Sequence, residues 1–221
     1  MKIALIGASG AAGSRILKEL SDRGHRVTAI ARDISRIASL PGVTARSGDA
    51  RDPQALAPQL EGHDAVVSSI HFVASDPEAL IAAVKAARGP RYLVVGGAGS
   101  LEVAPDGPRS LPVVGIGDLD IKPGAPLYDA PDFPALYLAE AKAGGAFLAR
   151  LKAEPELDWT FLSPAAEFVP GTRTGRFRLG GDELLVSDSG RSFISFEDYA
   201  VALVDEIETP KHRRARFTVG Y

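Results

Sequence analysis

Short apolar runs alternate with amphipathic segments over the first 95 residues of the chain. Five runs have the length and composition of buried strands and lie at residues 2–6, 26–31, 43–47, 64–70 and 91–95. Helical periodicity or capping signals separate them over residues 14–20, 34–37, 53–60 and 76–88. This alternation predicts a doubly wound parallel sheet, because right-handed crossovers place the helices on both of its faces.

The second half of the chain is less regular. Seven prolines lie between residues 105 and 134, so we expect no regular structure over most of 101–133. Apolar residues in this stretch nevertheless indicate packing: Leu111, Val113, Val114, Ile116, Leu119 and Leu127. The pattern then predicts a helix at 135–153, a strand at 157–162, a hairpin over 174–186, a helix that starts at Ser195 and a strand at 216–219.

We interpret the chain as one α/β domain over residues 1–221, with a small C-terminal extension on the substrate side. The proline-rich stretch follows the fifth strand, so residues 98–133 are expected to form a lid over the ligand-binding edge of the sheet. Residues 164–195 follow the sixth strand and are expected to form a second wall of that site.

Three glycines follow the first strand directly, at Gly7, Gly10 and Gly13. In this position Gly7 allows a tight turn, Gly10 lets the backbone approach a pyrophosphate, and Gly13 lets the helix pack close to the strand. The free N–H groups at the start of the helix would face the phosphates. Strand, glycine turn and helix together predict a Rossmann-like dinucleotide site. The alternative is a glycine-rich turn without a ligand.

The end of the second strand bears on the choice between NADP(H) and NAD(H). Arg32 comes first after the strand, and its guanidinium suits a 2′-phosphate. Asp33 is better placed to cap the short helix that follows it. We therefore expect NADP(H) to be preferred, with NAD(H) as the alternative, because a shift of one residue would exchange these two roles.

Composition narrows the range of partners. The chain has a net charge of −3 and no cysteine, which argues against a nucleic-acid surface, disulfides and thiolate chemistry. No apolar run reaches the roughly 20 residues of a membrane helix, and no signal-peptide pattern is present. We expect a cytoplasmic monomer or homodimer without a metal, a membrane contact or a nucleic-acid partner.

Several of these features resemble the NmrA-like, atypical short-chain dehydrogenase family. The resemblance rests on the 7–13 glycine motif, Arg32, the Gly48–Asp49 pair and residues 193–200. Within this family the chain is similar to the small NAD(P)H-flavin reductases over essentially its whole length. The departure from the commonest G-x-G-x-x-G spacing also points to these relatives.

The resemblance implies a set of cofactor-binding residues along the carboxyl edge of the sheet. The residues implied around the phosphates are Gly7, Ser9, Gly10, Ala11 and Gly13, with Arg32 at the 2′-phosphate. Asp49 and Ala50 are implied near adenine, and Ser69 and Ile70 along the ribose. Gly96, Gly97 and Ala98 are implied near the nicotinamide. Asp49 is equally well explained as a turn residue. His71 lies where it would contact cofactor or substrate, or it is an incidental loop residue.

The usual catalytic pair of this family is a Tyr with a Lys four residues later, in which the Lys promotes proton transfer by the phenol. Here Tyr137 is followed by Lys142, five residues on, and such a pair does not share a helix face well. Lys142 alone is therefore the first catalytic candidate and Tyr137 the second. Flavin reduction needs less, because stacked rings suffice for hydride transfer.

We accordingly expect an NADP(H)-dependent reductase that passes hydride to a small flat conjugated acceptor, such as a flavin or a quinone. One alternative is a non-catalytic NmrA-like regulator that binds the dinucleotide and senses redox state. A second is an extended-family sugar or steroid epimerase or dehydrogenase, for which a well-placed Tyr/Lys pair would be required.

Overall fold

The computed structural model describes residues 1–221 and contains one eight-stranded sheet. In sheet order its strands are β10 (Arg178–Gly180), β12 (Ala215–Gly220), β8 (Trp159–Pro164), β5 (Arg91–Val95), β4 (Ala65–Ser68), β1 (Lys2–Ile6), β2 (Arg26–Ala31) and β3 (Val43–Ser47). All neighbours are parallel except β10, which runs antiparallel to β12. The order reverses between β1 and β4, which confirms the doubly wound Rossmann-like topology.

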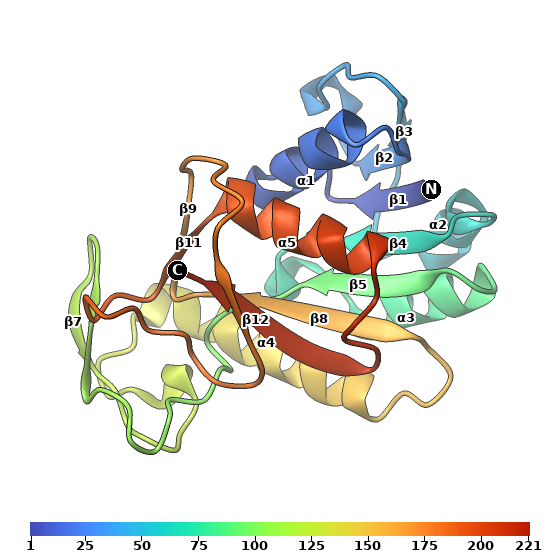
Figure 1. Ribbon diagram of the computed structural model, residues 1–221. Helices are drawn as coiled ribbons and strands as arrows, with labels where there is room; N and C mark the ends of the chain where they lie inside the picture. The colour runs from blue at the N-terminus through green and yellow to red at the C-terminus, as the bar shows by residue number, and fades with distance from the viewer.

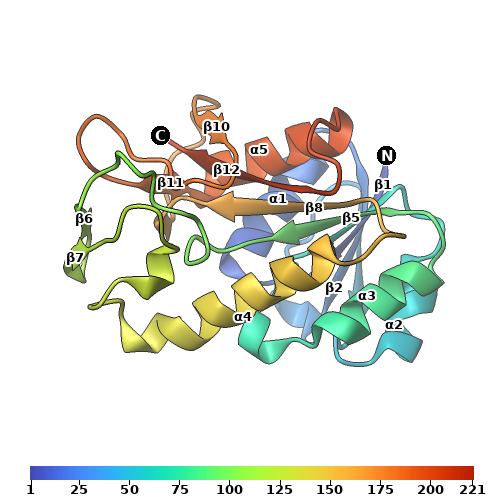
Figure 2. The same ribbon diagram turned by 90° about the horizontal axis from the view of Figure 1, so that it is seen from below.

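Helices cover both faces of this sheet (Figures 1 and 2). One face carries α1 (Ala11–Asp22) and α5 (Phe196–Glu208), and the other carries α2 (Pro53–Leu60), α3 (Pro77–Ala86) and α4 (Ala135–Lys152). Successive residues of a strand point to opposite faces, so each strand contributes to two cores. In β1, for example, Leu5 packs with α1 and α5, whereas Ala4 packs with α2, α3 and α4.

The predicted helix starts are confirmed by their capping contacts. The Asp52 carboxylate accepts the N–H of Ala55 in front of Pro53, and the Ser195 hydroxyl accepts the N–H of Asp198. The short 3-10 helix η1 (Ile34–Arg36) begins in the same way, because the Asp33 carboxylate accepts the N–H of Ser35. Side chains that compete for backbone N–H groups therefore set these boundaries.

The expectation that residues 101–133 lack regular structure is wrong in part. This stretch holds a hairpin, β6 (Ser110–Val113) with β7 (Gly117–Asp120), and the 3-10 helix η3 (Leu127–Asp129). Its predicted packing is confirmed for Leu111, Leu119 and Leu127, which belong to a separate core of eight buried residues, and Val113 packs against it. Val114 and Ile116 do not pack, since they lie at the hairpin turn and are 73% and 43% exposed.

The hairpin expected over 174–186 does not form. Residues 178–180 pair with β12 instead, and Glu183 forms a bridge with Glu102, at the root of the proline-rich stretch. The free edge of β12 and the burial of Leu184 in the small core together outweigh the local turn signal of Gly180–Asp182. The strand expected at 157–162 is β8, displaced two residues along the chain.

Contacts of buried side chains tie the small core to the sheet. The Arg216 side chain, on β12 and 3% exposed, donates to the Ser100 carbonyl at 2.8 Å and to the Asp182 carboxylate at 2.6 Å. Residues 98–133 therefore form a wall fixed at its root, located at the carboxyl edge of the sheet (Figure 2). Two further strands, β9 (Glu167–Val169) and β11 (Phe193–Ser195), pair in parallel within the same region.

Candidate functional site

The turn after β1 depends on glycine at two positions for internal reasons. Gly7 has a φ of +83°, and a Cβ there would lie 2.1 Å from the Ser69 carbonyl oxygen. A Cβ at Gly13 would lie 2.1 Å from the Gly7 carbonyl oxygen. The turn, the start of α1 and the segment after β4 are therefore in direct backbone contact. A side chain at either position would push these three elements apart.

Gly10 differs from its two neighbours in the motif. A Cβ there would meet the nearest atom, the Gly7 carbonyl oxygen, at an ordinary 3.4 Å, so the protein itself leaves room for a side chain. As the N-cap of α1, Gly10 also supplies no side chain to the N–H groups of the first turn, which contains no acidic residue. This arrangement leaves an open, positively polarised backbone surface that suits an anion such as a pyrophosphate.

At the end of β2, Arg32 extends into solvent without a carboxylate partner. The Asp33 carboxylate accepts a hydrogen bond from the Ser35 hydroxyl at 2.6 Å, and the Asp49 carboxylate forms an ion pair with the Arg51 guanidinium at 3.0 Å. Neither acid forms an ion pair with Arg32. The side-chain and backbone hydrogen bonds of Arg51, with a smaller contribution from the Arg32 charge, lower the pKa of Asp49. Arg32 thus lies close to the loop after β3, where an adenosine phosphate would lie if a dinucleotide crossed the sheet edge.

Arg36 is a second exposed arginine after β2, and no sequence pattern singled it out. It lies four residues after Arg32, in η1, and also makes no ion pair.

The turn role of Asp49 is seen directly, since its carboxylate accepts the N–H of Arg51 at 2.9 Å. Ala50 is buried in the core beneath α2, so only its backbone is available to a ligand.

The segment after β4 is held by a carboxylate from α4. The two Glu140 oxygens accept the N–H groups of Phe72, at 2.7 Å, and Val73, at 3.0 Å. Ser69 and Ile70 are half-buried behind this turn, and His71 is 84% exposed with its Nδ1 3.4 Å from Glu140 Oε1. No local signal could have identified this role of Glu140, because its partners lie 67 and 68 residues earlier in the chain.

Helix α4 also receives two close contacts through small residues. A Cβ at Gly144 would lie 2.9 Å from the Phe72 ring, and one at Gly99 would lie 2.4 Å from the Ala141 Cβ. The first three turns of α4 thus support both loops that border the predicted nicotinamide end. Among the residues expected there, Gly96 lies against the Phe161 ring, whereas a Cβ at Gly97 would have no atom within 4 Å, so this position is open to a ligand.

The structure separates the two candidate catalytic residues of α4. Tyr137 precedes the buried Gly144 by two helical turns, so it projects on the sheet-facing side, and it is 51% exposed. Lys142 precedes the buried Leu151 by nine residues, about 180° round the helix, and points away from the sheet. The expected precedence of Lys142 over Tyr137 therefore finds no support in the orientation of the helix.

Two hollows lie away from this edge. One, of about 350 Å³, is open and lies at the amino ends of β1, β2 and β3, beside Lys2, Arg26 and His63. The other, of about 250 Å³, is lined by α5 and the chain before β12. No cluster of His, Asp and Glu side chains is placed to hold a metal, and no helix is long and apolar enough to cross a membrane.

Comparison with known proteins agrees with this geometry. Residues 7–210 match the family model described as NAD(P)H-binding. The chain is 41% identical to the uncharacterised protein YwnB of Bacillus subtilis, over 99% of this chain and 98% of that protein. A solved structure from Bacteroides thetaiotaomicron, provisionally called an epimerase, is 39% identical with a TM-score of 0.86, over 100% of this chain and 96% of that one.

Two further structures add to the comparison. A Streptococcus pneumoniae protein provisionally called an NADH-flavin reductase is 35% identical, with a TM-score of 0.76, over 100% of this chain and 99% of that one. A Veillonella parvula short-chain dehydrogenase/reductase in complex with NADP is 17% identical with a TM-score of 0.76, over 100% and 94% of the two chains. The latter similarity shows a shared fold.

Proposed function

The chain belongs to the NAD(P)H-binding family, and we propose that within it the protein is an NADP(H)-dependent oxidoreductase whose acceptor is a flat conjugated molecule such as a flavin or a quinone. The observation that carries this proposal is the glycine turn. Two of its glycines are required by the fold, while the third leaves an unfilled backbone surface at a helix N-terminus. That surface fits a pyrophosphate.

The residues of the carboxyl edge fit the rest of the cofactor. Arg32 would hold the 2′-phosphate, with Arg36 as a second candidate four residues later, because neither guanidinium group forms an ion pair within the protein. Ser69 and Ile70 would border the ribose, and Gly97 would border the nicotinamide. When bound, the reduced cofactor supplies a hydride, and the protein contributes binding and orientation.

A flat acceptor is favoured over a carbinol substrate by the orientation of α4. Alcohol chemistry in this family uses a Tyr activated by a neighbouring Lys, whereas here Tyr137 and Lys142 project from different sides of the helix. Hydride transfer to a conjugated ring needs no such pair. The name of the Streptococcus pneumoniae relative, an NADH-flavin reductase, is in line with this acceptor class.

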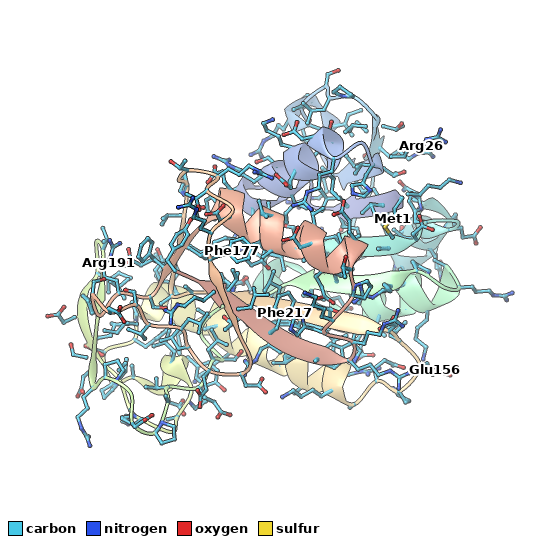
Figure 3. The ribbon with its side chains drawn as sticks, viewed as in Figure 1. Met1, Arg26, Glu156, Phe177, Arg191 and Phe217 are labelled. Atoms are coloured by element: carbon cyan, nitrogen blue, oxygen red, sulfur yellow. The ribbon has the colours of Figure 1, made fainter.

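The test is a calorimetric titration with NADPH and NADH of three proteins: the unaltered chain, Arg32→Ala and Arg26→Ala. Arg26 is the matched control, because it lies at the amino end of β2, the strand that Arg32 follows at its carboxyl end, and next to Met1 (Figure 3). Losing a hydrogen bond to a charged group costs about 1.5–3 kcal/mol, so Arg32→Ala should weaken NADPH binding roughly 10- to 100-fold and leave NADH unchanged.

Turnover is then measured as NADPH oxidation with FMN and with 1,4-naphthoquinone. We expect oxidation of NADPH with at least one of these acceptors. Equal binding of both dinucleotides by all three proteins would contradict the role of Arg32. Tight binding of NADPH without oxidation by either acceptor would contradict the reductase and favour the dinucleotide-binding regulator.

A further inference from the structure

We propose that His71 donates a proton to the acceptor and that Glu140 is the positioning residue that holds it in place. This inference rests on the proposed reductase function and narrows its substrate class. The acceptor would be a flat apolar ring system whose reduction leaves negative charge on an oxygen, as in a quinone. The sequence indicated His71 only as a contact residue, and the tertiary structure supplies its partner.

The position of the Glu140 carboxylate is determined by the backbone. Each of its two oxygens accepts one N–H group, from Phe72 or from Val73, at distances of 2.7 and 3.0 Å. The Phe72 ring packs against Gly144, four residues after Glu140 on α4, so the segment after β4 is held at a second point. These contacts set the carboxylate next to His71 before any ligand binds.

The His71 ring has one nitrogen toward the protein and one toward solvent. Nδ1 lies 3.4 Å from Glu140 Oε1, while Nε2 contacts no protein group and the side chain is 84% exposed. An imidazole with a carboxylate on one side and solvent on the other is placed to pass a proton to a ligand, as a general acid does. Glu140 is the only carboxylate within ion-pair distance of this ring. The Asp76 carboxylate accepts N–H groups of α3 instead.

The surroundings of this pair indicate the chemistry of the acceptor. Leu136 and Tyr137 lie one turn before Glu140 on α4, and Val73 follows His71 in the turn. Their exposed fractions are 82%, 51% and 61%. A single exposed apolar side chain is ordinary, but three that lie within one helical turn of Glu140 or two residues of His71 offer a surface on which an apolar ring can stack.

The proton balance of the step is complete. The hydride carries two electrons to the quinone, so one quinone oxygen gains a hydrogen and the opposite oxygen gains a negative charge. The N–H bond of His71 Nε2 breaks, and an O–H bond forms at the charged oxygen. Water returns a proton to Nε2, so the products are the hydroquinone and the oxidised dinucleotide.

The test compares the unaltered protein with His71→Gln, Glu140→Gln and the control Glu61→Gln, an exposed carboxylate on another element. With 1,4-naphthoquinone, we expect kcat of His71→Gln to fall roughly 100- to 10,000-fold and its decline toward alkaline pH to disappear. NADPH affinity should stay unchanged. A readout independent of turnover is the NMR signal of the His71 ring, which should move in Glu140→Gln and stay in place in Glu61→Gln.

The outcomes distinguish the two proposals. If the unaltered protein reduces the quinone and His71→Gln matches it in rate and pH profile, the proton-donor role is overturned while the reductase stands. An unchanged His71 ring signal in Glu140→Gln would overturn the role of Glu140. If the unaltered protein binds NADPH and reduces neither probe, the reductase fails and this inference fails with it.

Discussion

At the scale of single residues, one motif combines glycines with different physical roles. Gly7 and Gly13 are needed because a Cβ at either would come within 2.1 Å of a backbone oxygen. Gly10 meets only ordinary contact distances, so the folded chain gives no steric reason for glycine there. The requirement at Gly10 would come from the ligand, which makes it the most informative position in the turn.

The pair Gly7→Ala and Gly10→Ala tests this distinction. Gly7→Ala should lower the free energy of unfolding by several kcal/mol, because it adds a backbone overlap to the roughly 1–2 kcal/mol cost of a positive φ. Gly10→Ala should leave the melting temperature near that of the unaltered protein and weaken NADPH binding at least about tenfold. Thermal unfolding and calorimetry measure the two effects. Unaltered NADPH binding by a folded Gly10→Ala protein would argue against a pyrophosphate at this turn.

At the scale of elements, α4 organises the predicted nicotinamide end of the site. It binds the turn after β4 through Glu140 and Gly144, and the loop after β5 through Ala141. Its two adjacent glycines, however, are in different surroundings. Gly144 faces the Phe72 ring at 2.9 Å, whereas the nearest atom to a Cβ at Gly145 is 3.4 Å away.

This difference predicts opposite effects of the same substitution. An alanine in place of glycine within a helix gains about 1 kcal/mol, so Gly145→Ala should stabilise the protein by up to that amount. Gly144→Ala forces the Phe72 ring to move, and overpacking of this kind costs about 1–3 kcal/mol. Urea denaturation of the two variants measures both values. Equal stabilisation by both would show that the turn yields to α4 without cost.

At the scale of the whole molecule, buried carboxylates join elements that are distant in sequence. Glu19 on α1 is 4% exposed and accepts hydrogen bonds from Arg173, between β9 and β10, and from Arg23. Arg23 in turn pairs with Asp205 and Glu208 at the α5 end. The hydrogen bond from Arg173 contributes most to the lowered pKa of Glu19, and it outweighs desolvation.

A lowered pKa makes stability depend on pH in a defined direction. As the pH falls, the unfolded chain takes up the proton first, so the contribution of Glu19 is full above its ordinary pKa and is lost as the pH falls through the lowered one. Glu19→Gln should therefore cost roughly 1–3 kcal/mol at pH 7 and progressively less below about pH 4. Urea unfolding at both pH values measures this, with Glu61→Gln as the exposed control. A cost independent of pH would show that the Glu19 charge is not responsible.

The sequence by itself determined the alternation of strands and helices, the capped helix starts and the glycine turn. These features depend on side-chain period and on contacts within about four residues, which are legible along a chain. The fold class and the composition of the turn were predictable for that reason. The direction of Lys142 was not predictable in this way. Helical periodicity places it opposite Leu151, but the structure was needed to show that Leu151 lies on the buried face of α4.

Only the tertiary structure decided which distant segments meet. The turn signal at residues 180–182 was overruled by the free edge of β12, and the proline-rich stretch acquired its own core together with Leu184. Glu140 met its partners across 68 and 67 residues of intervening chain. Such contacts depend on the packing of whole elements against the sheet, and no local pattern of residues encodes them.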